Sequence, residues 1–374
     1  MTGGHAAGGW ELHLWQPELS PHLLPLYRAL RNRREVQSAT FIYDRKLDVA
    51  REKLGWSVEL EPQDRLVHPR SESQVEELVA GSRADSVHIF GGMHWVPSIV
   101  HGLRMCIKHK RRFGLMHEPR VLEGWKGKLR LAHSWASEGD LRKHAGFVLA
   151  VGRHGPGWFW LTGFRRDRIF DFAYFLPAPV AQRRSRAAVP QIGFVGRLER
   201  EKGFHLFLSA TEHMKTVADV HVFGAGTLAA LARQRLNGLG EWGHFHGPVP
   251  MREVAGWLEE LDVLVLPSIT TNDGWGAVIS EALMAGTAVV CSDRVGASMC
   301  IAEPGLGEVV RGMSPQGLAA AIDKVLSSDL GEASRQRRRD WALPRLSQEG
   351  GADYLLRILD HVYSGGRRPE SFVA

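Results

Sequence analysis

The sequence of 374 residues has few cysteines and no long apolar run. Its three cysteines, Cys106, Cys291 and Cys300, show no C-x-x-C spacing. We therefore predict no zinc site and expect a reducing compartment. No stretch approaches the roughly 20 apolar residues that a transmembrane helix needs. The start of the chain also lacks the basic and apolar regions of a signal peptide, so we expect a cytoplasmic location.

Motifs for nucleic-acid binding are also missing. The sequence contains no helix-turn-helix, zinc-finger or RNP-type pattern, so we expect no nucleic-acid partner. The chain is nevertheless basic, with a net charge of +6 and an isoelectric point near 9.4. This excess of positive charge favours another anionic partner, such as a nucleotide diphosphate or an anionic lipid surface.

The alternation of apolar runs with helical patterns predicts an α/β fold of two domains. Composition is that of an ordinary globular protein, with 44% hydrophobic and 24% charged residues. Segment 178–189 is polar, flanked by proline and without periodicity, which indicates a linker and a domain boundary near residue 185. The predicted strands are 11–16, 86–90, 113–116, 147–151, 192–195, 220–223, 263–266 and 288–291, and the predicted helices include 26–33, 98–109, 251–258, 277–285 and 350–364.

The stretch 261–296 combines a strand, a loop, a helix and a second strand. Its loop would lie at the carboxyl edge of the sheet, where open α/β sheets bind ligands. Gly274 and Gly276 allow close backbone approach near a helix N-terminus, which favours phosphate. Asp273 can accept hydrogen bonds from sugar hydroxyls, and Glu281 from a ribose diol. The alternative is an ordinary helix start with an exposed glutamate.

A second group of candidate residues follows strand 192–195. Arg197 and Lys202 lie in a turn flanked by Gly196 and Gly203. Two cations there could stabilise a leaving diphosphate, whose negative charge grows as a glycosidic bond breaks. An exposed charged turn is the alternative. Gly224 and Gly226, after strand 220–223, could make backbone contacts with the same ligand or form a tight turn.

Titratable residues also follow strands in the first half. His117 and Glu118 end strand 113–116, and His94 follows a glycine pair after strand 86–90. Titratable pairs at strand ends are typical of α/β active sites, although a structural His–Glu pair is equally expected. His22, in a proline-rich loop, is a weaker candidate, because a loop histidine is usually only solvated.

Two of these patterns resemble a known family. The run Asp273-Gly-Trp-Gly-x4-Glu281 is similar to the E-x7-E signature of GT-B glycosyltransferases of the family 4 type. Asp replaces the first Glu of that signature, and Trp275 replaces its usual Phe. The run 196–203 resembles the GRL-x3-KG turn in which Arg and Lys grip the donor diphosphate. His246 matches an element that usually lies beside the nucleotide base. The resemblance is specific over 190–310 and holds only in outline over 10–180.

The resemblance implies a GT-B fold, in which two Rossmann-like domains face each other across a cleft. Domain 1–185 would bind the acceptor, domain 186–350 the nucleotide sugar, and 351–374 would begin with a helix that crosses back to the first domain. The implied activity is retaining, metal-independent hexosyl transfer from a nucleotide-diphosphate sugar to a glycan or lipid-linked acceptor, in cell-surface polysaccharide synthesis. The sequence has no Asp-x-Asp motif for a catalytic cation.

Residues and resemblance together give the predicted site. Two alternatives to glycosyl transfer stay open for the activity of the protein: a non-hydrolysing sugar-nucleotide 2-epimerase and an inactive sugar-nucleotide binder. The basic run 108–112 is either a helix end or a contact with an anionic membrane surface. The predicted catalytic residues are Asp273, Arg197, Lys202, His117 and Glu118; donor binding is assigned to Gly196, Gly224, Gly226, His246, Gly274, Trp275, Gly276 and Glu281, and the acceptor side to His22 and His94.

Overall fold

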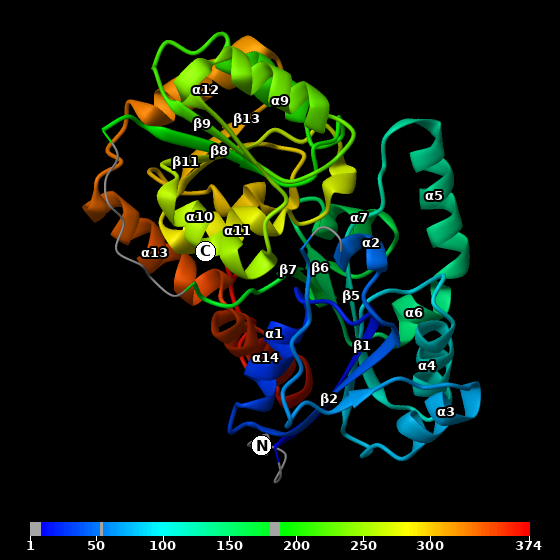
Figure 1. Ribbon diagram of the computed structural model, residues 1–374. Helices are drawn as coiled ribbons and strands as arrows, with labels where there is room; N and C mark the ends of the chain where they lie inside the picture. The colour runs from blue at the N-terminus through cyan, green and yellow to red at the C-terminus, as the bar shows by residue number, and fades with distance from the viewer. Residues whose placement is uncertain (1–8, 53–54, 180–187) are drawn as a thin grey trace.

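The computed structural model describes residues 9–52, 55–179 and 188–374, which form two parallel β-sheets with helices on their faces (Figure 1). The strands of the first sheet are β1 (Trp10–Glu18), β2 (Val36–Arg45), β3 (Leu66–Val67), β4 (Val87–Phe90), β5 (Arg112–His117), β6 (Phe147–Val151) and β7 (Ile169–Phe172). Their order is β3-β2-β1-β4-β5-β6-β7, and every pairing is parallel.

The second sheet is built from the second half of the chain. Its strands are β8 (Gln191–Val195), β9 (Asp219–Phe223), β10 (Gly243–Gly247), β11 (Val263–Leu266), β12 (Ala288–Ser292) and β13 (Gly307–Val310). They are parallel in the order β10-β9-β8-β11-β12-β13. The expected α/β architecture with two Rossmann-like sheets is therefore present.

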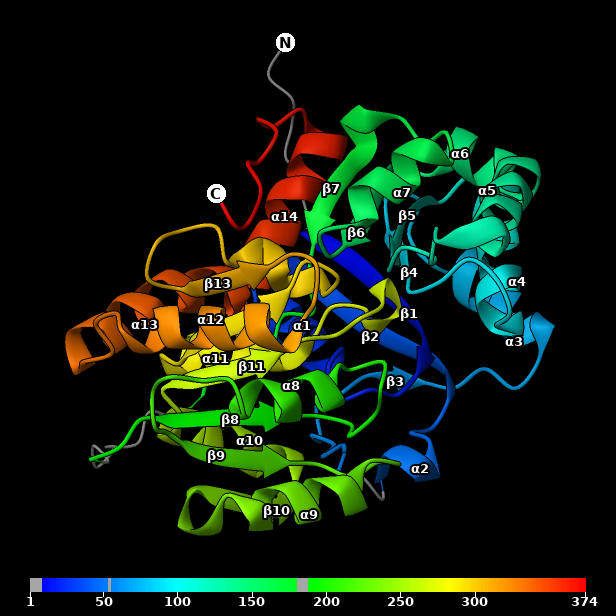
Figure 2. The same cartoon turned by 90° about the horizontal axis from the view of Figure 1, so that it is seen from above.

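Helices connect the strands and cover both sheets (Figure 2). In the first half they are α1 (Leu24–Arg31), α2 (Val49–Glu52), α3 (Glu72–Ala80), α4 (Pro97–Lys108), α5 (Gly124–Ser137), α6 (Gly139–His144), α7 (Gly155–Leu161) and the 3₁₀ turn η1 (Arg166–Arg168). In the second half they are α8 (Phe204–Thr211), α9 (Ala229–Gly238), η2 (Gly240–Trp242), α10 (Met251–Glu260), η3 (Thr271–Asp273), α11 (Ala277–Ala285), η4 (Gly296–Cys300), α12 (Pro315–Leu326), α13 (Glu332–Leu346) and α14 (Gln348–Ser364). No helix in the described part of the chain is both long and apolar enough to cross a membrane.

The central strands are buried on both faces, as their continuous apolar sequences predict. Strands β6 and β11 and helix α11 begin and end at the predicted residues. The predicted helix 26–33 is wrong at both ends. Helix α1 begins at Leu24, with Pro25 in its first turn, where proline loses no helical hydrogen bond, and it ends at Arg31. Five strands were not predicted: β2, β3, β7, β10 and β13. Strand β3, for example, has only two residues, which carry no periodic signal.

The last helix returns to the first half of the chain. In α14, Asp353 pairs with Arg33 of the segment after α1 (2.9 Å). Near the end of α14, the ring of Tyr363 packs edge-on against Phe147 of β6 at 6.2 Å between centroids. The predicted domain boundary near residue 185 lies outside the described residues, so the domain limits stay a prediction.

Backbone contacts join loops at the carboxyl ends of the two sheets. The Arg153 N–H, after β6, donates to the Gly296 carbonyl, after β12 (3.0 Å). A Cβ on Gly152 would lie 2.8 Å from Gly296 Cα, so side chains are excluded at this crossing. Farther along, the Met251 N–H at the start of α10 donates to the Gly55 carbonyl (3.0 Å). The carboxyl edges of the two sheets therefore meet.

The packing of α14 against the segment between the two halves can be tested with one methyl group. A Cβ on Gly351 would lie 2.1–2.6 Å from atoms of Phe175, whereas a Cβ on Gly157 in α7 would meet nothing within 4 Å. We expect Gly351→Ala to lower the free energy of unfolding by about 1–2 kcal/mol, because overpacking outweighs better helix propensity. Gly157→Ala is the control and should raise it by up to about 1 kcal/mol. Urea denaturation of both variants measures the difference, and equal stability would contradict this packing.

Candidate active site

The glycine-rich loops after β8 and β9 pack backbone against backbone. The Leu198 N–H donates to the Ala225 carbonyl (2.9 Å). A Cβ on Gly224 would lie 1.9 Å from the Gly196 carbonyl oxygen, and one on Gly226 would lie 2.6 Å from the Leu198 carbonyl oxygen. Only glycine allows this approach, so the three predicted glycines form one surface of adjoining backbone at the sheet edge.

Lys202 and Asp273 form an ion pair between the two predicted motifs. The Asp273 side chain is 2% exposed and the Lys202 side chain 17% exposed. The Ser268 hydroxyl, after β11, donates to the second carboxylate oxygen of Asp273. Burial and Ser268 therefore fix the carboxylate at the carboxyl end of β11.

A second cation lies close to this pair. Burial, followed by the charge of Arg197, lowers the pKa of Lys202 to about 8, against the charges of two nearby glutamates. The Arg197 side chain itself is exposed. Two cations held this close repel each other, and an anion placed between them would relieve that repulsion.

Glu118 reaches across from the first half to the loop before α11. The Trp275 N–H donates to Glu118 Oε1 (3.3 Å). A Cβ on Gly274 would lie 2.4 Å from the same carboxylate, so glycine is required there. Tyr174 lies beside Glu118, and burial followed by this negative charge raises the pKa of its hydroxyl well above the usual range. The predicted donor loop therefore already binds one carboxylate.

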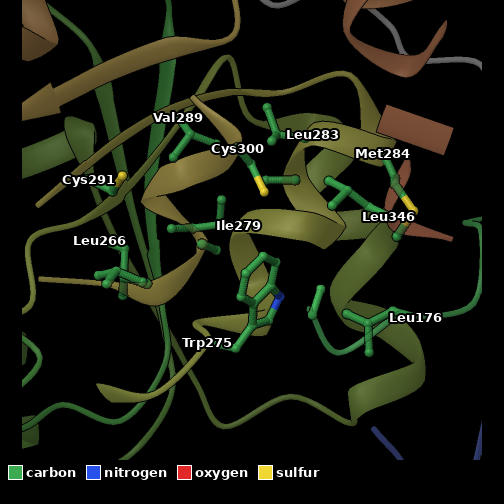
Figure 3. Packing of buried hydrophobic residues seen from close by; sticks show 14 of the residues in the cluster. Leu176, Leu266, Trp275, Ile279, Leu283, Met284, Val289, Cys291, Cys300 and Leu346 are labelled. Atoms are coloured by element: carbon green, nitrogen blue, oxygen red, sulfur yellow. The ribbon is translucent and has the colours of Figure 1, made fainter. Parts of the chain in front are cut away.

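Trp275 contributes only its backbone to this loop. Its indole is 1% exposed and donates to the Ser280 hydroxyl (2.9 Å). Figure 3 shows the indole among buried side chains that include Ile279 and Leu266. The predicted donor contact of Trp275 is thus restricted to its N–H group, because the side chain belongs to the core.

Gly276 and Glu281 lie at the start of α11. Gly276 has φ of 80°, and a Cβ there would lie 2.4 Å from Val295. The Glu281 side chain follows about one turn into the helix, and burial raises the pKa of its carboxyl to about 7. Within the described residues, no hydrogen-bond donor or cation contacts this carboxyl. It is therefore an available acceptor beside the glycine loop.

A second titratable cluster lies beside Glu118 in the first half. His117 contacts the Glu118 carbonyl through Nδ1, and burial, with a further effect of His94, lowers the pKa of His117. His94 Nε2 lies 3.1 Å from Glu138 Oε1. The Glu138 side chain is fully buried, and its second oxygen has no hydrogen-bond partner among the described residues. The cluster holds a neutral His117 next to an oriented His94.

Glu138 was missed by the sequence reading. It ends α5 in polar surroundings, where no pattern distinguishes a buried acid from a solvated one. Its burial depends on the packing of the loop after β4 against α5, where the rings of His94 and His133 lie 5.7 Å apart. Tyr174 was missed for the same reason, because only the fold brings it beside Glu118. Ser268 was missed although it lies five residues before Asp273 in the same loop.

His22 is packed rather than solvated. Its ring meets Trp56 edge-on at 4.6 Å between centroids. Burial, with a smaller effect of Arg51, lowers the pKa of His22 to about 4, so the imidazole is neutral at physiological pH. Arg51 also affects the pKa of Tyr174, which places this group on the same side of the site as Glu118.

His246 lies in the edge strand β10, away from the Lys202–Asp273 pair. Its ring stacks on Phe223 at 4.3 Å and 6° between planes, and lies 4.8 Å from the ring of Trp257. Burial, followed by the charge of His244, lowers its pKa. The stack supplies a flat aromatic surface near the carboxyl end of β10, and contact with a base stays a prediction.

Three residues near the amino ends of β9 and β10 have metal-ligand geometry. Ligand atoms of Asp219, His221 and His244 lie within 4.8 Å of one another. The Gln191 amide bridges two of them: its Oε1 accepts from His221 Nε2 (2.7 Å), and its NH2 group donates to Asp219 Oδ2 (2.6 Å). These groups already contact one another, and His221 Nδ1 also lies 3.0 Å from Nε2 of His246.

Comparison with known protein families gives one match. Residues 189–328 match the model for the glycosyl transferases group 1 family. D-inositol 3-phosphate glycosyltransferase of Corynebacterium urealyticum is 32% identical over 150 residues, which cover 37% of this chain and 35% of that protein. Glycogen synthase of Mycobacterium tuberculosis is 29% identical over 221 residues, covering 58% and 51%. The matched parts thus span about a third to a half of the length of these relatives.

Solved structures resemble nearly the whole chain. The apo lipopolysaccharide outer core galactosyltransferase WaaB superposes with a TM-score of 0.70 at 13% identity, covering 94% of this chain and 99% of that one. HepE of Anabaena in complex with UDP gives 0.69 at 16% identity, covering 94% and 100%. At this identity the likeness concerns the fold alone. The GT-B fold therefore extends over both halves of the chain, and residues 189–328 match the group 1 glycosyltransferase family.

Proposed function

We propose that this protein is a retaining glycosyltransferase that moves a hexosyl group from a nucleotide-diphosphate sugar to a glycan or lipid-linked acceptor. The observation that carries the proposal is the Lys202–Asp273 pair, set beside Arg197 and the glycine loops. The family match over residues 189–328 and the UDP named with the HepE structure support a nucleotide donor. Cell-surface polysaccharide synthesis is the process we propose.

The proposed donor site uses the second half of the chain. Lys202 and Arg197 bind the diphosphate, and Lys202 exchanges its contact with Asp273 for a phosphate oxygen. The freed Asp273 then accepts a hydrogen bond from a donor-sugar hydroxyl. Glu281 accepts from the ribose diol as a carboxylate, and its raised pKa means that the carboxyl is partly protonated near neutral pH. The glycine backbone of the two neighbouring loops lies close enough to the phosphates to donate N–H groups.

Charge development then accounts for catalysis. As the glycosidic bond breaks, negative charge grows on the leaving diphosphate, and the two cations stabilise it more strongly than in the ground state. The leaving phosphate oxygen takes the acceptor proton on the same face, so no strong protein base is required. His117, held neutral by burial, and Glu118 orient the reacting sugar. Arg197 and Lys202 take the place that a metal ion has in metal-dependent transferases.

The acceptor side lies in the first half. His94, held by the buried Glu138, presents its second ring nitrogen, and His22 lies beyond Arg51 on the same side. We place the protein in the cytoplasm, because its three cysteines are buried free thiols, which fits a reducing compartment.

A panel of nucleotide sugars tests the proposal. A donor at 100 times its dissociation constant should add about 2.7 kcal/mol of stability in a thermal-shift measurement. The stabilising donor is then incubated with and without glycan and lipid-linked acceptors, in the presence of a chelator. Transfer that needs an acceptor and survives the chelator is expected. An epimerised donor without acceptor would indicate a 2-epimerase, and binding without conversion an inactive binder.

The proposed diphosphate site predicts a role in turnover for the two cations, Arg197 and Lys202. Arg197→Ala and Lys202→Ala should lower turnover by roughly 10²–10³-fold and the Michaelis constant for the donor far less, because the diphosphate gains charge in the transition state. Arg200→Ala is the matched control, since Arg200 is an exposed cation of the same turn. If all three variants keep the wild-type turnover, the diphosphate binds elsewhere.

The second prediction concerns Glu281. Because its pKa is raised to about 7, donor affinity should weaken as the pH falls below about 7, and Glu281→Gln should abolish this pH dependence. Losing the charged acceptor should weaken donor binding by about 1–3 kcal/mol. Calorimetric titration of both proteins with the donor, from about pH 5.5 to about pH 8.5 on either side of the raised pKa, measures this difference.

The same carboxyl should reduce the stability of the free protein. A folded-state pKa above the unfolded value means that the unfolded chain loses the proton first as pH rises, so wild-type stability falls between the ordinary carboxyl pKa and about 7. Glu281→Gln should therefore be more stable than wild type at neutral pH. Denaturation at pH 4 and pH 8, values chosen roughly either side of that window, compares the two. A less stable variant at pH 8 would refute an unpaired buried carboxyl.

A further inference from the structure

Helix α5 carries its apolar residues on the wrong side for a core helix. Its packed side holds small or polar residues, with Gly127 and Ser134 buried. The opposite side carries Trp125 and Leu129, which are 68% and 58% exposed. A surface helix of a globular protein normally turns its large apolar residues inward. The reversed pattern indicates that the outer face of α5 has a partner outside this chain.

The outer residues form one continuous stripe. Trp125, Leu129, Ala132 and Ala136 are spaced by four, three and four positions, which places them on one face of a helix, and all four are exposed. We call these four residues the α5 stripe. Figures 1 and 2 both place α5 at the outer edge of the first half, where the stripe can meet a large flat surface.

The charges around the α5 stripe have one sign. Residues 124–137 contain no aspartate or glutamate, and Lys126 and Lys128 flank the stripe as exposed residues. Among the described residues neither lysine forms an ion pair with a carboxylate; the Lys126 ammonium lies 5.8 Å from the ring centre of Trp125. An apolar stripe between unpaired lysines suits a surface that is apolar below and anionic above.

A second exposed aromatic lies near this helix. Trp95 is 84% exposed and has φ of 69°, a left-handed conformation that costs free energy in a residue with a side chain. The preceding His94 packs against His133 of α5, which ties the Trp95 loop to the helix. The fold thus holds a tryptophan outward beside the α5 stripe at an energetic cost.

Four residues of the basic run 108–112, by contrast, have partners within the chain. Lys108 and His109 contact Glu76 at 2.6 and 3.3 Å. The Arg111 guanidinium donates to the Ala80 carbonyl (2.8 Å), and the Arg112 guanidinium lies 4.8 Å from the centre of the Tyr363 ring. These contacts favour the reading of this run as an ordinary helix end.

We infer that the α5 stripe docks on a bilayer that contains anionic lipid. Trp125 and Leu129 enter the interface between headgroups and acyl chains, and Lys126 and Lys128 contact lipid phosphates. Glu123, just before α5, pairs with Arg294 of the second half, so docking holds both halves of the candidate site at the membrane surface. The inference goes beyond the proposed function, because it names a surface and its partner without depending on catalysis.

Sedimentation of the full chain with vesicles tests the inference. We expect binding to vesicles of phosphatidylcholine and phosphatidylglycerol at low salt, and its loss at high salt, where the Debye length falls to about 3 Å. Lys126→Gln with Lys128→Gln should weaken partitioning roughly 20- to 30-fold, at about fivefold or slightly more per lysine. Trp125→Ser with Leu129→Ser should weaken it roughly tenfold or more. Brominated acyl chains should quench wild-type fluorescence more than that of Trp125→Phe.

Matched controls separate the α5 stripe from other surfaces. Lys108→Gln with Lys110→Gln removes the same charge from the end of α4. Leu60→Ser with Val217→Ser removes exposed apolar side chains elsewhere, since Leu60 is 60% exposed and Val217 is 63% exposed. Both controls should bind vesicles like the wild type, and every variant should keep the wild-type melting temperature.

Three results would overturn the inference. These are failure of the wild type to sediment at low salt, unchanged binding of the Trp125/Leu129 variant, and equal loss of binding in the Lys108/Lys110 control. A wild-type dimer that becomes a monomer in the Trp125/Leu129 variant would show that a second copy covers the stripe. Thermal stabilisation by UDP is measured in parallel, so failure of donor binding and failure of membrane docking appear as separate results.

Discussion

The ion pair between Lys202 and Asp273 is the interaction on which the candidate site depends. Both side chains are largely removed from water, which costs each charge its hydration. Their mutual attraction offsets that cost only while the two remain in contact. A buried pair of this kind does not need to add much stability, but it holds a cation and an anion ready to exchange partners. A diphosphate and a sugar hydroxyl are chemically suited to make that exchange.

The backbone around the pair is arranged to leave room for a ligand. Glycines at the carboxyl ends of β8 and β9 bring two loops into direct backbone contact, and Gly274 leaves space for a carboxylate from the other half. Glu118 fills that space and binds the Trp275 N–H. A donor that uses the same N–H must displace Glu118, so the contact between the halves and donor binding are coupled through one backbone group.

Several features of the molecule reduce stability where a ligand would restore it. Glu281 is half-buried without a cation among the described residues, and the second oxygen of Glu138 is buried without a hydrogen-bond partner there. Trp95 is held in a left-handed conformation and exposed, while Trp125 and Leu129 face solvent on α5. Carboxylate oxygens removed from water without a partner and exposed apolar stripes both cost free energy, and they lie on or beside the surfaces proposed for donor, acceptor and lipid.

The sequence alone determined the parallel strands and the order of the motifs, because these depend on local pattern. Apolar runs such as β6 and β11 must be buried on both faces, and glycines after strands mark loops at the carboxyl edge. The Arg197–Lys202 turn and the Asp273–Glu281 spacing were readable for the same reason, since each lies within one short segment.

Only the tertiary structure decided which of these groups contact one another. It paired Lys202 with Asp273, brought Glu118 to the Trp275 N–H, and buried Glu138 behind His94. It also turned the Trp275 indole into the core and the α5 stripe toward solvent. Such contacts join residues far apart in the chain, or depend on which side of a helix faces the sheet. Both are fixed by the packing of whole elements, which no local pattern encodes.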